Sequence, residues 1–102
     1  MKMDQMLKQA QKLQAEMAKA QEQLADERVE GVSGGGMVKV TANGRGDILG
    51  ISIDPEVIDP DDKDILEDLL LAAINEAARK TAELGRERLG KLGGNLGIPG
   101  LF

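Results

Sequence analysis

Residues Val29 to Asp54 read VEGVSGGGMVKVTANGRGDILGISID and decide the fold, because apolar side chains recur there at every second position. This period is typical of half-buried β-strands. Residues 43–47, with Gly44 and Gly46, predict a hairpin loop between two such strands, and residues 29–33 predict a weaker first strand. The stretch therefore predicts a three-stranded antiparallel meander. Its alternating apolar residues are Val38, Val40 and Ala42, then Leu49, Ile51 and Ile53.

On the N-terminal side of this stretch the period changes to alternating steps of three and four, which predicts an amphipathic helix. At 1.5 Å per residue this helix would be roughly 35 Å long, too long for a small globule to cover. Much of it must project or meet a partner. The stripe consists of Met3, Met6, Ala10, Leu13, Met17, Ala20 and Leu24.

On the C-terminal side a second long helix is predicted to begin at Asp59 as N-cap, with Pro60 in the first helical position. Two apolar stripes lie about 120° apart on its surface, so we expect it to be buried on two sides. One stripe would cover the sheet and the first helix, and the other would face a second subunit. The first stripe is Leu66, Leu69, Leu70, Ala73, Ala77 and Leu84; the second is Leu71, Ile74, Ala78, Ala82 and Leu89.

These elements predict an α+β fold: a long N-terminal helix, a three-stranded antiparallel sheet and a long C-terminal helix. Residues 1–90 would form a single helix–sheet–helix domain. Residues 91–102 are rich in glycine, and we expect an irregular or flexible tail from about Gly90 onward.

The composition argues against an enzyme. The 102 residues include no His, Cys, Trp or Tyr and a single Phe. The commonest general base, the thiolate nucleophile and the usual zinc ligands are therefore absent, and we expect no cofactor, no metal and no small-molecule substrate. Neither a secretory signal nor an apolar run long enough for a membrane span is visible, so a cytoplasmic protein is expected.

Charge is unevenly distributed. The net charge is −5, which by itself argues against nucleic acid, but residues 44–72 carry nine acidic and two basic side chains, a net charge of −7. Residues 73–102 have a net charge of +2. If the helices are antiparallel, basic side chains from both would gather at one tip, far from the acidic loop 54–68. An ordinary solvated helix surface is the alternative. The tip residues would be Lys2, Lys8, Lys12, Lys80, Arg86, Arg88 and Lys91.

Several blocks of sequence, in order along nearly the whole chain, resemble the YbaB/EbfC family of bacterial nucleoid-associated proteins. They are LKQAQKLQ (7–14), EGVSGGGMVKV (30–40), NG (43–44), IDP (53–55), LEDL (66–69), AAINEA (72–77) and the IPGL tail (98–101). The resemblance implies a tweezer-like homodimer that binds, bends or compacts double-stranded DNA with limited sequence preference. Its DNA contacts would lie on the projecting helices, here at Lys2, Lys8, Lys12, Lys19, Arg79, Lys80, Arg86, Arg88 and Lys91.

We therefore expect a homodimer of the nucleoid whose DNA binding depends mainly on phosphate contacts and falls steeply with salt. Core and dimer interface would be built from Val38, Val40, Leu49, Ile51, Leu71 and Ile74. The alternative is a coiled-coil module that docks a partner protein through Met3, Met6 and Met17. Apolar docking of that kind would be insensitive to salt.

Overall fold

A three-stranded antiparallel sheet, in the order β1-β2-β3, forms the centre of the computed structural model, which describes residues 2–95. Strands β1 (Arg28–Ser33), β2 (Val38–Asn43) and β3 (Ile48–Ile53) make the predicted meander. A short 3₁₀ turn, η1 (Gly34–Gly36), connects β1 to β2, and its three glycines all have positive φ angles.

The hairpin between β2 and β3 is held by the side chain of Asn43. Its Oδ1 accepts hydrogen bonds from the backbone N–H groups of Arg45 and Asp47, at 2.9 and 3.0 Å. The register shifts by one residue just before this hairpin: Thr41 is opposite Gly50, but Ala42 is opposite Ile48. Leu49 is thereby left without a partner on β2, as in a β-bulge.

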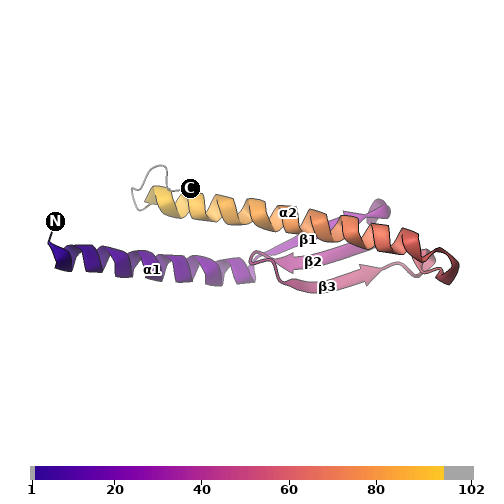
Figure 1. The fold of residues 1–102 in the computed structure, drawn as a ribbon, viewed down its shortest axis with the longest axis horizontal. Coiled ribbons are helices and arrows are strands. Elements are labelled where there is room, and N and C mark those ends of the chain that lie inside the picture. The colour runs from indigo at the N-terminus through magenta and orange to yellow at the C-terminus, as the bar shows by residue number, and fades with distance from the viewer. Residues whose placement is uncertain (1, 96–102) are drawn as a thin grey trace.

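Helix α1 (Met3–Asp26) precedes the sheet and matches the predicted N-terminal helix to within two residues. It lies beyond the end of the sheet and is attached there mainly through its last turn (Figure 1). Leu24 is buried, and its carbonyl oxygen accepts a hydrogen bond of 2.8 Å from the backbone N–H of Gly44 in the hairpin.

Helix α2 (Lys63–Asn95) starts later and ends later than predicted. Asp59 does cap a helical turn, by accepting a hydrogen bond from Asp61 N–H, but that turn is the 3₁₀ segment η3 (Pro60–Asp62). A similar turn, η2 (Pro55–Val57), precedes it. The prediction of irregular chain from Gly90 was wrong as far as Asn95, because hydrogen-bonded helix continues through the glycines; residues 96–102 of the predicted tail lie outside the described residues.

The core lies between α2 and the first two strands. Three residues of β2, at 0–1% exposure, meet the small side chains of Ala73 and Ala77 on α2, both 0% exposed. The first predicted stripe of α2 therefore covers the sheet, as expected. Partly buried Leu66, Leu69, Leu70 and Ile74 pack around this centre, which consists of Val38, Val40 and Ala42.

Strand β3 differs from β2 because α2 lies across β1 and β2 and does not cover it. Ile51 pairs with Val40 across the ladder, so both point to the same face of the sheet, yet Val40 is buried and Ile51 is 50% exposed. Val38 and Val40 are thus core residues of the single chain with no surface left for a partner, which corrects their assignment to a dimer interface. Leu49, Ile51 and Leu71 belong to the surface instead.

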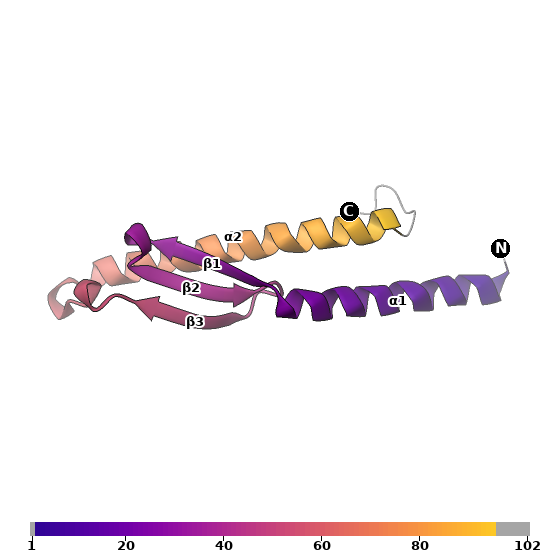
Figure 2. The ribbon, with the colours of Figure 1, turned by 180° about the vertical axis from the view of Figure 1, so that it is seen from behind.

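The whole chain is elongated, with principal extents of 69 × 21 × 16 Å. Its radius of gyration of 19.3 Å is well above the roughly 13 Å of a compact chain of this length. The N-terminal end of α1 and the C-terminal end of α2 project in the same direction beyond the sheet (Figures 1 and 2). The two helices run antiparallel, as the basic-tip hypothesis required, although α1 lies beyond the sheet and not beside it (Figure 1). The predicted α+β fold class is confirmed.

Within the described part of the chain, neither helix has a stretch both long and apolar enough to span a membrane.

Candidate nucleic-acid interface

Two helical arms extend from the sheet. The α1 arm is Met3–Asp26. The α2 arm is residues 82–95, because Thr81 is the residue that bonds the end of the sheet, donating its hydroxyl to the carbonyl oxygen of Asn43 at 3.2 Å. Both arms extend beyond the same end of the sheet (Figure 2).

The four predicted lysines on the α1 side are all exposed. Lys8, Lys12 and Lys19 lie within about 40° of one another around the helix axis, given 100° per residue. Lys2 stands at the N-cap position of the same helix. Between residues 2 and 95 none of the four makes an ion pair, so these ammonium groups are available to a phosphate.

The five predicted cations of α2 are not equivalent. Arg86 is exposed and, within the same residues, makes no ion pair. Arg79 and Lys91 lie one turn from a carboxylate of their own helix, at 2.7 Å from Glu83 and 3.4 Å from Glu87. These exposed i,i+4 pairs are weak and would exchange readily for phosphate.

Lys80 lies beside the sheet, not at the tip. Its Nζ donates to the backbone oxygen of Glu30 at 2.6 Å and is 3.2 Å from a carboxylate oxygen of Glu76. The hydrogen bond from Lys80 is the main reason that the pKa of Glu76 is below its ordinary value, with the backbone N–H of Val32 assisting. Lys80 is therefore a residue that joins α2 to β1, and its place in the predicted basic tip is not supported.

Arg88 is also committed within the chain. Its guanidinium forms an ion pair with Glu27, the residue that caps the C-terminus of α1. Both side chains are about one third exposed, at 33% and 36%. This pair joins the base of the α1 arm to the side of the α2 arm, so Arg88 too does not lie at the tip to which it was assigned.

Arg45 is a further cation, outside the set predicted from the sequence. It is exposed at the turn of the β2–β3 hairpin, next to Gly44, which bonds the end of α1. It therefore lies near the base of the α1 arm. Only the tertiary contact between the hairpin and α1 reveals this, because residues 20–26 and residue 45 are distant in sequence.

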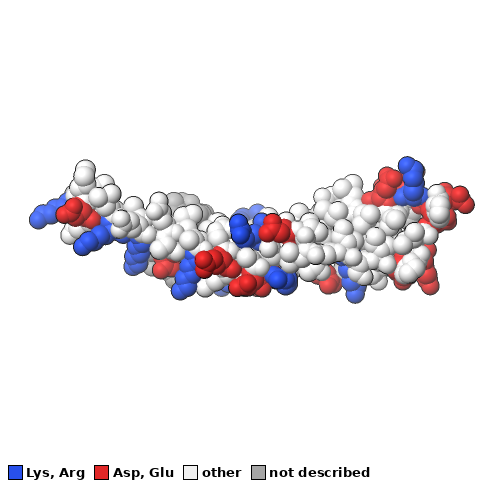
Figure 3. All heavy atoms as spheres, turned by 90° about the horizontal axis from the view of Figure 1, so that it is seen from below, with Lys and Arg blue, Asp and Glu red and all other residues white. Residues whose placement is uncertain are grey.

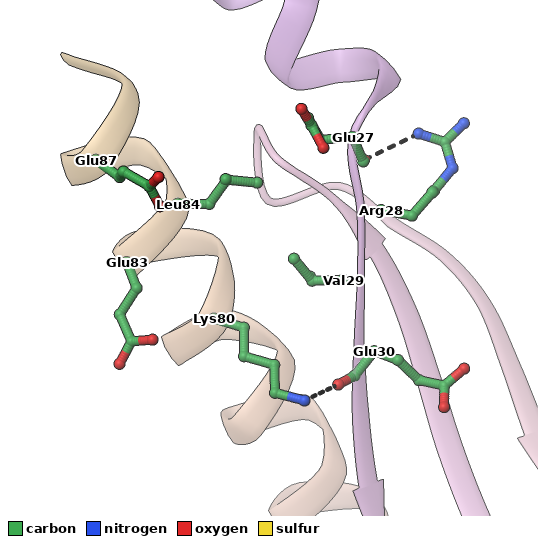
Figure 4. A pocket seen from close by; sticks show the side chains of 8 residues that line it. All are labelled: Glu27, Arg28, Val29, Glu30, Lys80, Glu83, Leu84 and Glu87. Carbon is green, nitrogen blue, oxygen red and sulfur yellow. Dashed lines mark hydrogen bonds between the residues drawn. The ribbon is translucent and has the colours of Figure 1, made fainter. Parts of the chain in front are cut away.

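An open groove of about 450 Å³ runs between α2 and β1. Val29 and Leu84 point into it, and Lys80 reaches across it to Glu30 (Figure 4). Carboxylates outnumber cations on its walls, so it does not suit a phosphate. Its other lining residues are Glu27, Arg28, Glu83 and Glu87. Within the described chain, no group of three or more acidic side chains is placed to hold a metal ion.

The opposite end of the molecule is acidic. Carboxylates gather at the end that includes η2, η3 and the start of α2, away from the N-terminus of α1 (Figure 3). Between the ends, the face seen in Figure 3 has an uncharged area over the sheet region. The acidic end is therefore far from the arms, as expected, but each arm carries carboxylates beside its cations, and a basic tip stays a prediction.

Comparison with known proteins gives a family for the chain. The YbaB/EbfC DNA-binding family matches residues 1–96. A nucleoid-associated protein of Pelotomaculum thermopropionicum is 50% identical over 100 residues, covering 98% of this chain and 95% of that protein. Nucleoid-associated protein TTE0040 of Caldanaerobacter subterraneus subsp. tengcongensis is 53% identical over 97 residues, covering 95% of this chain and 87% of that protein.

A solved structure shares the fold. The crystal structure of uncharacterized protein HP0035 from Helicobacter pylori is similar with a TM-score of 0.79 and 27% sequence identity, over 90% of this chain and 96% of that chain. The match therefore includes the helices as well as the sheet. The family matches nearly the whole chain, and the relatives, named as nucleoid-associated proteins, are 50% and 53% identical to it; the chain therefore belongs to the YbaB/EbfC DNA-binding family.

Proposed function

We propose that this protein binds double-stranded DNA as a homodimer in the nucleoid and bends or compacts it, with the arms gripping the duplex. The observation that carries the proposal is the row of exposed lysines on the α1 arm, Lys8, Lys12 and Lys19, which have no carboxylate partner between residues 2 and 95. Lys2 and Arg86 extend this set. Membership of the DNA-binding family supports the assignment of these cations to phosphate.

A second copy of the chain is the proposed cover for β3. Ile48, Leu49 and Ile51 are 46–50% exposed on one strand, and Leu71 of α2 is 59% exposed. Several apolar side chains of this size on one uncovered strand favour association, because their contact with water is unfavourable. Dimerisation would bring two pairs of arms together, and so two sets of cations to one duplex.

Recognition would depend on phosphates and not on bases. Lysines contact the DNA backbone without reading its sequence, so binding is expected to be weakly selective. The sequence has no Trp or Tyr to stack on unpaired bases, which favours duplex over single strands.

The test is duplex binding measured by fluorescence anisotropy at several salt concentrations, between about 50 and 200 mM. Replacing Lys8 and Lys12 with Ala removes four cations from a dimer, and the slope of log K against log salt should become shallower by about 3 to 4. The matched control is Lys39→Ala with Lys63→Ala, two exposed lysines of the sheet and of the acidic end. If both double variants lower the slope equally, the arms are not the DNA surface.

The docking of a partner protein through the α1 arm stays the second candidate, because Met3, Met6 and Met17 are 75%, 55% and 39% exposed. Methionine side chains adapt to many apolar partners. Replacing all three with Gln would abolish binding of that kind at any salt concentration, but would leave DNA binding by the lysines intact.

A further inference from the structure

One ion pair in the described chain differs from the rest. Four pairs join residues one turn apart on α2, whereas Glu27 and Arg88 are 61 residues apart and join the base of the α1 arm to the α2 arm. The Nε atom of Arg88 is buried and, among residues 2–95, has no hydrogen-bond acceptor. The guanidinium is thus partly buried and paired with one carboxylate, whereas a cation that only binds phosphate would be exposed.

Glu27 occupies the joint of the α1 arm. It is the single residue between α1 and β1, with extended φ and ψ angles of −81° and 149°. In the last turn of α1, the carbonyl oxygen of Leu24 accepts a hydrogen bond from the backbone N–H of Gly44. The carbonyl oxygen of Ala25 accepts one from the side chain of Arg28 at 2.8 Å. These bonds attach the end of α1 to the sheet, but none of them connects it to α2.

We propose that Glu27 and Arg88 form the contact that sets the angle between the two arms, and that Arg88 acts as a positioning residue and not as a phosphate ligand. The ion pair is a charged link between the base of one arm and the side of the other, beside the contacts that α1 itself makes with α2. The predicted effect on DNA affinity rests on the proposed function, whereas the effect on the arm angle does not, because the angle exists without DNA.

A small rotation at Glu27 has a large effect at the end of the arm. Gln9 is 18 residues from the joint, which is about 27 Å of helix, so a rotation of about 10° moves it by roughly 5 Å. That displacement is comparable with the rise of one to two base pairs, about 3.4 Å each, and would take the lysines out of register with the phosphates.

The arm angle can be measured directly. The sequence contains no cysteine, so Gln9→Cys and Ala82→Cys, both at exposed positions, provide two unique sites for spin labels. Doubly labelled chain is diluted into an excess of unlabelled chain, so that each dimer carries at most one labelled chain. Double electron–electron resonance then measures the distance between the two labels within that chain. The distribution of label-to-label distances should be narrow in the wild-type background. It should be shifted or wider in Glu27→Gln or Arg88→Gln. The exchanged pair, Glu27→Arg with Arg88→Glu, should narrow it again.

DNA binding separates a positioning role from a phosphate contact. Glu22→Gln is the matched control, because it removes the same charge from an exposed position of α1 that has no ion pair within the described chain. If Glu27 and Arg88 set the arms, Glu27→Gln binds duplex at least about threefold more weakly than Glu22→Gln, in spite of the lost negative charge. If Arg88 is a phosphate ligand, Glu27→Gln releases it, and binding is at least as tight as in Glu22→Gln.

Three results would overturn the inference: unchanged distances in both single variants, no recovery in the exchanged pair, or DNA binding by Glu27→Gln that equals or exceeds that of Glu22→Gln. A wild-type protein that binds no duplex at low salt would instead contradict the proposed function. The distance measurements would still decide whether the pair sets the arms.

Discussion

Gly31 on β1 faces the backbone of α2 at Ala73 and Ala77 so closely that no β-carbon fits between them. A β-carbon built on Gly31 would overlap the carbonyl oxygen of Ala73 and lie 2.6 Å from the backbone N of Ala77. The same strand is bonded to α2 on either side of this contact, by Ser33 to the Leu69 carbonyl and by Lys80 to the Glu30 carbonyl, both at 2.6 Å. The helix that carries one arm is therefore seated on the sheet by backbone contact.

Gly31→Ala should consequently destabilise the protein by about 3 kcal/mol, because the added methyl group must push the backbone of α2 away from the sheet. Urea denaturation followed by circular dichroism measures the effect. Gly50→Ala is the control: it lies on β3 with nothing within 4 Å of the added carbon, and its free energy of unfolding should change by less than about 1 kcal/mol. If the free energy of unfolding fell equally in the two variants, the close backbone contact between Gly31 and α2 would be refuted.

Replacing Leu49 and Ile51 with Lys should convert a dimer to a monomer without unfolding the chain. Both side chains are about half exposed, at 49% and 50%, so they contribute little to the core of the single chain. Sedimentation velocity gives the mass, and circular dichroism checks the fold. Met6→Lys with Met17→Lys adds the same charge to the α1 arm and should leave the dimer intact. A dimer that survives the Leu49 and Ile51 changes would place the interface elsewhere.

The depressed pKa of Glu76 predicts a loss of stability in acid. The hydrogen bond from Lys80 stabilises the charged carboxylate, so this contribution is present above the ordinary pKa of 4.5 and is lost as the pH falls through the lower folded value. Lys80→Met should raise the pKa of Glu76 toward 4.5, as measured by NMR titration of its carboxyl carbon. Lys63→Met, far along the helix, should not move it. An unchanged Glu76 titration in Lys80→Met would rule out this cause.

Gly85→Ala and Gly90→Ala should stabilise the α2 arm. Both glycines are helical, with open space around an added β-carbon, and glycine inside a helix costs about 1 kcal/mol relative to alanine. Amide hydrogen exchange in residues 82–91 should slow by about fivefold for each change. Gly46→Ala, with a φ angle of 95°, is the opposite case and should destabilise the hairpin. No slowing in the arm would mean that helix propensity does not limit its order.

The sequence by itself determined the elements and their order. Strict alternation in residues 38–42 and 48–53 and steps of three and four in residues 3–24 depend only on the backbone periods of strand and helix, and these elements were predicted to within a few residues. The end of α2 was missed because Gly90 and its neighbours have poor helix propensity, which an already formed helix can tolerate. The family resemblance was likewise visible in the sequence and is confirmed.

Only the tertiary structure decided which equivalent-looking residues are available for function. Val40 and Ile51 alternate identically and face the same side of the sheet, but α2 covers one strand and not the other. Arg86 and Arg88 are two residues apart, yet one is exposed and the other is paired with Glu27 across 61 positions. Periodicity specifies a direction relative to the local backbone, whereas burial and ion pairing depend on what another part of the chain places there.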